Sequence, residues 1–535
     1  MSNPHLTDIP AQFSAHGSGG MVASADAHAT KAGVETLRRG GNAVDAAIAT
    51  NAAMAVVGPH LCGMGGDLLA LVWASGEVHC LNSSGRAGSG TSADAVRAEG
   101  FGEMPFRHDL RAVTVPGCVD GWIALHERFG SLPLADVLAP AIALATDGFP
   151  ASPLLAFAVR QLDDAGRRNL ATIADQAGTA DATVRLPGVA RSLAAVAGGG
   201  RGAFYEGEFG KGLRRLGAGL FSADDLARVQ ADWVTALSTD AFGVTLHTVP
   251  PNSQGYLTLA AARLATAVGL PADPDDPQWA HTLVECAKQA GFDRLDVLAE
   301  GVDGAALLAA IDARVGAVDT QRASGLGAPG LDGDTTYLCT VDGDGMGVSL
   351  IQSNASGFGS WIAEPDTGIN LHNRGLGFSL VPGHPAELAP GRRPPHTLSP
   401  ALATRGGRLA SVFGTMGGDA QPQILLQVAA RLFAHGQAPG DAVAAARWAL
   451  AGPSTGFDTW APGATGPDGS RLTVNVEGHA PAEWAADLER RGHRVAERPR
   501  SDSGFGHAHA IVIDADGERH GGADPRTRVG ACSAA

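Results

Sequence analysis

One junction, between a loose segment and a strand-like run, strongly limits what this chain can fold into. The loose segment is Arg322-Ala-Ser-Gly-Leu-Gly-Ala-Pro-Gly330, and the run begins at Thr335-Thr336-Tyr337-Leu338. Apolar and β-branched residues in the run predict a buried strand. A flexible leader, a hydroxyl residue and then a buried sheet form the arrangement that a self-cleaving precursor needs.

Cleavage of the chain before Thr335 would change the chemistry of that residue. Thr335 would then carry both a nucleophilic hydroxyl and a free α-amino group. An α-amino group has a reference pKa of about 8, so it can act as the base for the hydroxyl at neutral pH. The junction is therefore a candidate catalytic site as well as a boundary.

Composition limits the class of protein and its partners. The chain has 535 residues, of which 44% are hydrophobic, so it can bury a large core. This length allows two or three domains, or one large fold of intertwined layers. The net charge of −16 argues against nucleic acid or an anionic membrane surface as a partner.

The six cysteines indicate neither a zinc ribbon nor a thioredoxin-like site, because no two of them form a CxxC pair. We interpret them as buried free thiols. Residues 1–20 are polar and lack the pattern of a signal peptide. The apolar run 43–57 carries Asp45 and Asn51 and is too short to span a membrane. We expect a cytoplasmic protein.

The pattern of apolar residues changes at residue 334. Before it, helices are predicted at 27–39, 43–57, 131–146, 279–290 and 294–299 and within 155–235, with strands at 68–74 and 244–249. Asn42 is the predicted N-cap of the second helix. After residue 334, strands are predicted at 337–341, 347–352, 400–404, 409–413, 471–476, 495–499 and 509–513, with helices at 422–433 and 442–450.

Three other motifs favour less specific interpretations. Gly325-Leu-Gly327-Ala-Pro-Gly330 matches GxGxxG, but Pro329 blocks the helix that must follow in a dinucleotide site. His507 and His509 could face one side of a strand, but no carboxylate or third histidine lies nearby in the sequence to complete a metal site. The chain has no GxSxG elbow, which disfavours an α/β-hydrolase.

A glycine pair and two arginines are candidates for binding a reacting amide. Gly417 and Gly418 stand between a predicted strand and a predicted helix, where backbone N–H groups can face a developing oxyanion. An ordinary turn is the alternative. Arg86 and Arg374 could each bind a substrate carboxylate, although a surface arginine is the commoner explanation for either alone.

Taken together, these signals and several short motifs resemble the γ-glutamyltransferase family of N-terminal-nucleophile hydrolases over nearly the whole chain. The order and spacing of the motifs are more specific than any one of them. They are Gly41-Asn42-Ala43-Val44-Asp45-Ala46-Ala47, Gly63-Met64-Gly65-Gly66-Asp67, Val115-Pro116-Gly117, residues 140–145 with Asp147-Gly148-Phe149, Pro250-Pro251, Asp334-Thr335-Thr336, Phe358-Gly359-Ser360, Gly417-Gly418 and Asp524-Pro525-Arg526.

The resemblance implies catalytic roles by position. Thr335 matches the nucleophile, so cleavage would fall between Asp334 and Thr335. Ser353 matches the hydroxyl residue that holds the nucleophile, and Gly417 and Gly418 match the oxyanion-hole glycines. No metal or organic cofactor is implied.

The substrate-binding positions depart from the glutamyl-specific pattern. His396 and Thr397 replace a Ser-Ser pair, and Arg374 stands where Gln or Glu is frequent. Gly377 replaces an Asp that binds the substrate α-amine, which puts glutathione recognition in doubt. Arg86 lies two residues from the place expected of the arginine that binds the α-carboxylate. The run 351–360 and Asn373-Arg374-Gly375 resemble the cytoplasmic branch that includes oxamate amidohydrolase-like enzymes.

The family resemblance implies an α+β fold, a four-layer αββα sandwich. Residues 1–334 would form the large chain and 335–535 the small chain of one intertwined domain, with a homodimer of such pairs as a further expectation. Three hypotheses follow: a γ-glutamyl hydrolase or transferase, an amidohydrolase on a small carboxylate-bearing amide such as oxamate, and a non-catalytic protein that kept the fold. Two bands on a denaturing gel would exclude the third.

Overall fold

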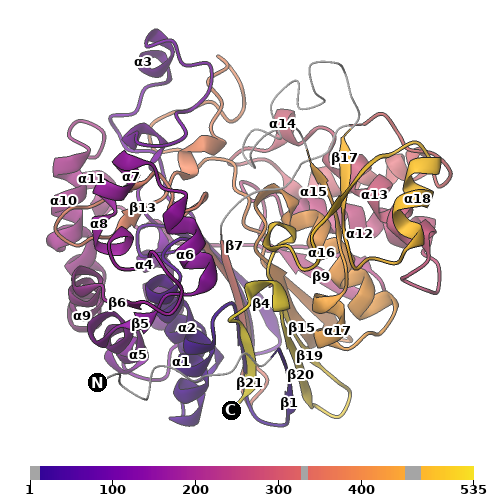
Figure 1. Ribbon diagram of the computed structural model, residues 1–535, viewed down its shortest axis with the longest axis horizontal. Helices are drawn as coiled ribbons and strands as arrows, with labels where there is room; N and C mark the ends of the chain where they lie inside the picture. The colour runs from indigo at the N-terminus through magenta and orange to yellow at the C-terminus, as the bar shows by residue number, and fades with distance from the viewer. Residues whose placement is uncertain (1–12, 327–334, 452–471) are drawn as a thin grey trace.

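Two central sheets lie face to face between two layers of helices in the computed structural model (Figure 1). The structure describes residues 13–326, 335–451 and 472–535. Asp334, and with it one side of the predicted cleavage site, lies outside these residues, as do Gly327–Gly330 of the GxGxxG match. The layers form an αββα sandwich, which confirms the predicted α+β fold.

Each central sheet has seven strands. The first has the spatial order β21 (Ala531–Ala534), β2 (Met21–Ser24), β10 (Thr336–Val341), β11 (Gly347–Ser353), β3 (Asp67–Ala74), β4 (Glu77–Ser83), β7 (Asp232–Val234). The second has the order β1 (Ser14–Gly17), β20 (Arg519–Ala523), β19 (Ala508–Ile513), β15 (Arg408–Thr415), β14 (Ala401–Arg405), β9 (Val244–Thr248), β8 (Leu237–Ala241). Each sheet thus combines strands from before and after Thr335.

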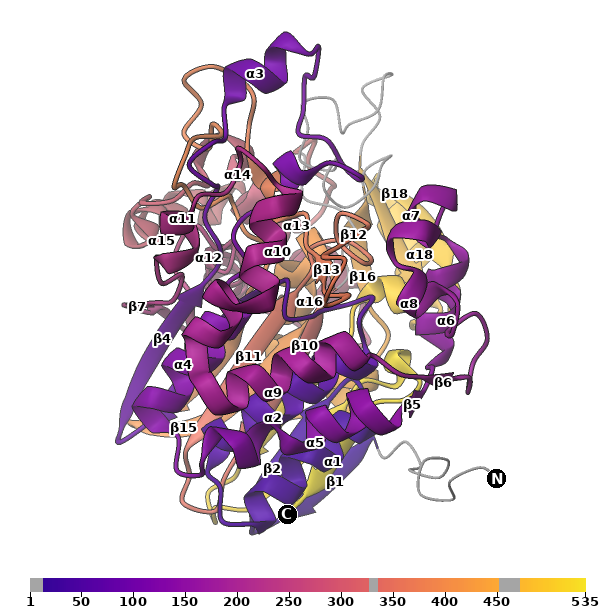
Figure 2. The same cartoon turned by 90° about the vertical axis from the view of Figure 1, so that its left-hand side faces the viewer.

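The helices divide between the two outer faces. Figure 2 shows α1, α2, α4, α5 and α9 in front of the first sheet. That side comprises α1 (Ala27–Arg38), α2 (Ala43–Val57), α4 (Cys118–Phe129), α5 (Leu134–Asp147), α6 (Pro153–Arg160), α7 (Asp164–Asn169), α8 (Ala171–Ala174), α9 (Pro187–Gly202), α10 (Glu208–Leu216) and α11 (Ala223–Ala227). The other side comprises α12 (Tyr256–Val268), α13 (Pro277–Gly291), α14 (Arg294–Val297), α15 (Gly304–Ala310), α16 (Gln421–Ala429), α17 (Pro439–Ala444) and α18 (Glu483–Arg490).

Alternation along β3 explains why two layers pack on one strand. Leu68, Ala70 and Val72 join the core under the helices, whereas Leu69 and Leu71 join the core between the sheets. Successive side chains of a strand point to opposite faces, so both faces of β3 must be covered. From Leu68 to Ala74 the strand is apolar for that reason.

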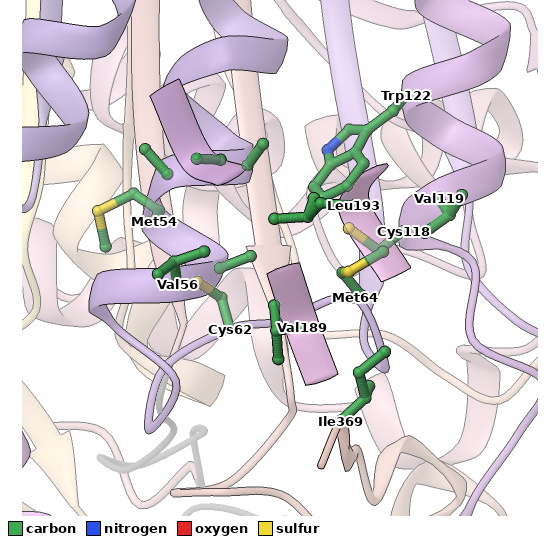
Figure 3. Close-up of a cluster of buried hydrophobic side chains, with 14 of the residues drawn as sticks. Met54, Val56, Cys62, Met64, Cys118, Val119, Trp122, Val189, Leu193 and Ile369 are labelled. Atoms are coloured by element: carbon green, nitrogen blue, oxygen red, sulfur yellow. The ribbon is translucent and has the colours of Figure 1, made fainter. Parts of the chain in front are cut away.

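In the core on the helix side, large side chains pack together with the small residues of α2. Figure 3 shows Trp122 and Leu193 beside Met64 and Cys118. Trp122 is fully buried, and its Nε1 donates to Asn51 Oδ1 of α2 at 2.7 Å. This bond satisfies the one polar group of the indole and links α4 to α2.

Helix α2 begins as the sequence predicts. Asn42 Oδ1 accepts hydrogen bonds from the backbone N–H groups of Val44 and Asp45, and the Asp45 side chain accepts from the Asn42 N–H. This reciprocal capping box satisfies donors that a helix N-terminus otherwise leaves unpaired.

Close packing of α2 against α1 depends on small residues. A Cβ at Gly33 would lie 2.2 Å from Thr50 Oγ1, so only glycine fits there.

The element predictions are confirmed except for one helix. The helix predicted at 442–450 ends at Ala444, and Trp448–Ala451 forms β16, which pairs with β17 (Thr473–Glu477) and through it with β18 (Arg494–Arg498). The Arg447 N–H donates to Glu477, and its guanidinium pairs with Asp524 at 2.6 Å. These tertiary partners outweigh the helical propensity of an alanine-rich run.

None of the described helices is both long and apolar enough to cross a membrane. The six cysteines are buried and free, as expected.

Candidate active site

Thr335 lies directly before β10, where it is 1% exposed. Its Oγ1 donates to Ser353 Oγ at 3.0 Å. The register explains this contact: Thr336 pairs with Gln352, so the residues that flank this pair, Thr335 and Ser353, are neighbours across the two strands. The structure thus brings the predicted nucleophile and its predicted partner together.

The glycine pair lies at the same end of the sandwich as Thr335. Leu409 of β15 faces Gly347 of β11, and further along both strands Ser349 Oγ donates to Phe413 O at 3.4 Å. The two strands therefore run in the same direction across the sheet interface. Gly417 follows β15 at the end where β11 reaches Ser353, the partner of Thr335.

A close approach between the sheets reinforces this placement. A Cβ at Gly414 would lie 2.1 Å from Tyr337 Cε2. Gly414 stands three residues before Gly417, and Tyr337 stands two residues after Thr335. The missing side chain at Gly414 lets the two chain segments approach one another.

Both turn glycines adopt a conformation that other residues rarely reach. Gly417 has φ 139° and Gly418 has φ 52°. Gly418 begins a short 3₁₀ turn, Gly418–Ala420, that leads into α16. Backbone N–H groups at a helix start favour negative charge, as an oxyanion hole requires.

Arg374 connects Ser353 to Thr397, one of the residues predicted to bind substrate. This arginine is fully buried; its Nη2 donates to Ser353 Oγ at 3.1 Å and its Nη1 donates to Thr397 Oγ1 at 2.9 Å. Burial lowers the pKa of Arg374 to about 10, so the guanidinium stays charged at neutral pH. A positive charge therefore stands one hydrogen bond from the residue that holds Thr335.

Gln254 closes the network on the opposite side. Its Nε2 donates to Thr397 O at 2.9 Å and to Gly418 O at 3.0 Å. Thr397 and the glycine turn are thereby fixed relative to each other. No sequence signal pointed to this role, because Gln254 stood out only as part of the turn that follows Pro250-Pro251.

His396 is held by Asp67 rather than facing open space. The Leu398 N–H donates to His396 Nδ1, so Nε2 carries the proton that it donates to Asp67 Oδ2 at 3.0 Å. Burial lowers the pKa of His396 to about 3, which keeps the ring neutral. Burial alone would raise the pKa of Asp67, but His372, His396 and Arg374 lower it to about 2.

Asp67 lies beside Ser353, the hydrogen-bond partner of Thr335, because the two residues pair in the β3–β11 register. Asp419, next to Gly418, forms a second buried ion pair with Arg294 at 3.2 Å. Sequence reasoning gave no role to Asp67, Asp419 or Arg294. The glycine motifs that directly precede Asp67 and Asp419 were the only sequence signal near these two aspartates, and Arg294 had none.

The remaining predicted residues support the site less directly. Asn373 Oδ1 accepts from the Ser356 N–H at 3.1 Å, and its Nδ2 donates to Phe106 O, so it shapes the loop that carries Arg374. Arg86 pairs with Glu300 at 2.5 Å and with Asp232 at 2.9 Å. The substrate-binding role of Arg86 stays a prediction.

The two histidines that the sequence offered as possible metal ligands, His507 and His509, each bind a neighbouring group of the protein. His509 Nδ1 accepts from the Asp524 N–H at 3.2 Å, and its ring stacks with Tyr337. His507 Nε2 and Ser503 Oγ share a hydrogen bond of 2.8 Å.

The αββα sandwich, with a buried threonine directly before a central strand and a glycine turn at the same end, has the fold of the N-terminal-nucleophile hydrolases. The sequence profile named Gamma-glutamyltranspeptidase matches residues 29–534. The chain belongs to the gamma-glutamyltranspeptidase family, and it is an enzyme of that family's hydrolase and acyltransferase type.

Individual relatives cover nearly the whole chain. The glutathione hydrolase-like YwrD proenzyme of Bacillus subtilis is 34% identical, over 95% of this chain and 97% of the relative. The oxamate amidohydrolase proenzyme of Klebsiella pneumoniae is 33% identical over the same shares. A cephalosporin acylase from Bacillus halodurans has a similar solved structure, with a TM-score of 0.87 and 33% identity over 100% of this chain and 99% of that one.

Proposed function

We propose that this enzyme cleaves itself between Asp334 and Thr335 and then hydrolyses or transfers the acyl group of a small amide through an acyl-enzyme on Thr335. The observation that carries the proposal is the 3.0 Å hydrogen bond from Thr335 to Ser353 directly before a buried strand, at the end of the sandwich where the Gly417-Gly418 turn also lies. Residues 1–334 and 335–535 would be the large and small chains.

Maturation and turnover use the same groups. In maturation the Thr335 hydroxyl attacks the Asp334 carbonyl, the N–C bond gives way to an ester, and water hydrolyses the ester. In turnover the α-amine of Thr335 takes the hydroxyl proton, the oxygen attacks the substrate amide, and the proton leaves with the amine product. Water or a second amine then releases the acyl group. Gly417 and Gly418 would stabilise the oxyanion, and losing one such donor typically costs about 100- to 1000-fold in rate.

Two substrate classes remain, and two observations favour the second. The first class is γ-glutamyl amides and the second is small amides that carry a carboxylate, such as oxamate. Arg374 offers a buried positive charge beside Ser353, suited to a carboxylate close to the scissile bond. A Cβ at Gly377 would lie 2.4 Å from Pro395 O, so this backbone has no room for an aspartate that binds an α-amine.

Similar relatives carry names from both classes. The Klebsiella pneumoniae relative is named an oxamate amidohydrolase proenzyme and the Bacillus subtilis relative a glutathione hydrolase-like proenzyme. Because the two relatives are almost equally identical to this chain, sequence identity does not decide between the substrate classes, and the preference rests on the residues of the site. The homodimer of chain pairs and the cytoplasmic location stay predictions.

Thr335→Ala and Thr335→Ser test the nucleophile. We expect Thr335→Ala to give one uncleaved band on a denaturing gel and no amidase activity, because the attacking oxygen is gone. Thr335→Ser keeps an oxygen and should retain cleavage. Two bands or full activity from Thr335→Ala would overturn the proposal.

A substrate panel separates the two classes. Purified enzyme is assayed with oxamate and with a γ-glutamyl anilide under the same conditions. We expect the higher kcat/KM with oxamate, whereas a higher value with the anilide would restore the γ-glutamyl assignment.

A further inference from the structure

A cluster of buried polar side chains joins α13 to the chain just after α18, away from the catalytic network. It comprises His281, Glu285 and Lys288 of α13 together with His493. All four are buried, with exposed fractions of 0% for His281 and Glu285, 4% for Lys288 and 6% for His493. Figure 1 shows α13 and α18 side by side on the outer face. Burial of this many polar groups is costly unless they bind one another.

The hydrogen bonds of the cluster fix which ring nitrogens carry protons. A carbonyl oxygen only accepts, so His281 Nε2 donates to Asp319 O at 2.9 Å. The other nitrogen of this neutral ring, Nδ1, then accepts from His493 Nε2 at 2.9 Å. His493 Nδ1 is left as an acceptor, and Lys288 Nζ lies 3.5 Å from it. Each step follows from the one before, which indicates one ordered chain of donors and acceptors.

The cluster holds the backbone of residues 319–324. The Ser324 N–H donates to both carboxylate oxygens of Glu285 at 3.2 Å, and Lys288 donates to Ser324 O at 3.4 Å and to Glu285 at 2.9 Å. Arg491 Nη1 donates to Thr320 O at 2.8 Å, and the Arg491 carbonyl accepts from the Ala323 N–H. The two ends of this segment are therefore held by charged and polar side chains of both predicted chains.

The held segment precedes the predicted cleavage site in the sequence. Ser324 precedes Thr335 by eleven residues, and so many residues span at most about 40 Å. Thr335 itself is held by Ser353, so the connecting chain is anchored at both ends. Fixing both ends of a chain segment restricts the conformations that the segment can adopt. Attack on the Asp334 carbonyl depends on the conformation of the segment next to Thr335.

We propose that His281, Glu285, Lys288 and His493 form a clamp that positions the segment ahead of the cleavage site and thereby speeds self-cleavage, without taking part in turnover by the mature enzyme. The proposal rests on the self-cleavage proposed above. Its residues are positioning residues. Because His493 and Arg491 follow residue 335, the clamp also keeps residues 319–324 of the large chain on the small chain after cleavage.

A metal ion is the competing explanation for this cluster. His281, Glu285 and His493 offer ligand atoms within 4.8 Å of one another. The Lys288 ammonium, however, lies 2.9 Å from the Glu285 carboxylate, where it supplies the positive charge that a cation would bring. The hydrogen bond between His281 Nδ1 and His493 Nε2 also occupies ring nitrogens that would be needed to bind the ion.

The test compares two substitutions of one histidine. His281→Leu removes the donor to Asp319 O, and His281→Gln keeps a donor near the same place. The full precursor is made by cell-free translation, and its conversion into two chains is followed on denaturing gels. We expect His281→Leu to slow cleavage by about 2- to 10-fold, the effect of one neutral hydrogen bond, and His281→Gln to stay near the wild-type rate. The kcat/KM per cleaved molecule should be unchanged in both.

Asp120→Asn is the matched control for general destabilisation. It weakens the ion pair between the buried Asp120 and the half-buried Arg201, which lies among the large-chain helices. We expect it to lower the denaturation midpoint while cleavage keeps the wild-type rate. Wild-type cleavage speed in His281→Leu would overturn the clamp, as would stoichiometric zinc in the purified protein together with slower cleavage in chelator. A wild-type chain that never cleaves would instead overturn the proposed function.

Discussion

At the scale of single residues, the site depends on which buried groups remain charged. Arg374 and Asp67 are both buried, yet burial lowers the pKa of the arginine only to about 10, and its neighbours lower the pKa of the aspartate to about 2. Both are therefore charged at neutral pH. His396, which donates to Asp67, stays neutral. Arg374 is consequently the charge that we expect a substrate carboxylate to meet.

Replacing Arg374 tests its role in substrate choice. Arg374→Met should lower kcat/KM for a carboxylate-bearing amide by about 10- to 150-fold, the equivalent of the roughly 1.5–3 kcal/mol of a hydrogen bond to a charged group. An amide of the same size without the carboxylate should lose less. For the carboxylate-bearing amide, the kcat/KM of Arg374→Lys, which keeps the charge, should lie between those of the wild type and Arg374→Met. Equal losses for both substrates with Arg374→Met would contradict the assignment.

Sequence alone predicted candidate reacting residues but few of the contacts around them. Thr335, Ser353 and the glycine pair were predicted from motif position, and the structure brings them to one end of the sandwich. Gln254 and Arg294 were not predicted as site residues, because their contacts join segments more than a hundred residues apart. Such pairings leave no local periodicity to find.

At the scale of elements, local chemistry decided most boundaries. The Asn42 cap predicted the start of α2 because its hydrogen bonds lie within one turn. The helix predicted over 442–450 failed because the partners of Arg447 and Trp448 lie on β17 and near Asp524, far along the sequence.

Removal of the Asn42 cap should destabilise the fold measurably. Asn42→Ala loses the acceptor for two N–H groups and should lower the free energy of unfolding by about 0.5–2 kcal/mol. Asn42→Ser, which keeps a capping oxygen, should lose less. Urea denaturation of the two variants and the wild type measures the difference. An Asn42→Ala midpoint equal to that of the wild type would show that the cap contributes nothing.

At the scale of the whole molecule, buried neutral histidines make the fold sensitive to acid. Burial lowers the pKa of His60, His396 and His507 to about 3 and that of His509 to about 4. Unfolded histidines have a pKa near 6.5. Between these values the unfolded chain binds more protons than the folded one, so stability rises with pH. The stability that these neutral histidines contribute is fully present above about pH 6.5 and declines as the pH falls toward 3.

Denaturation midpoints measured between pH 7.5 and pH 5 test this expectation. We predict a clear decrease over that range, which lies above the usual pKa of carboxylates and so isolates the histidines. His60→Gln should make the decrease shallower, because one proton fewer is taken up on unfolding. A midpoint that does not change over this range would contradict the prediction.

The central claim is that a threonine freed at the start of β10 carries the acyl group. The most direct measurement is mass spectrometry of the purified protein, before and during turnover of a slow amide substrate. The account predicts a small chain that begins at Thr335 and gains the mass of the acyl group on its N-terminal peptide. An active protein that remains one unbroken chain, or an acyl adduct on any other residue, would contradict it.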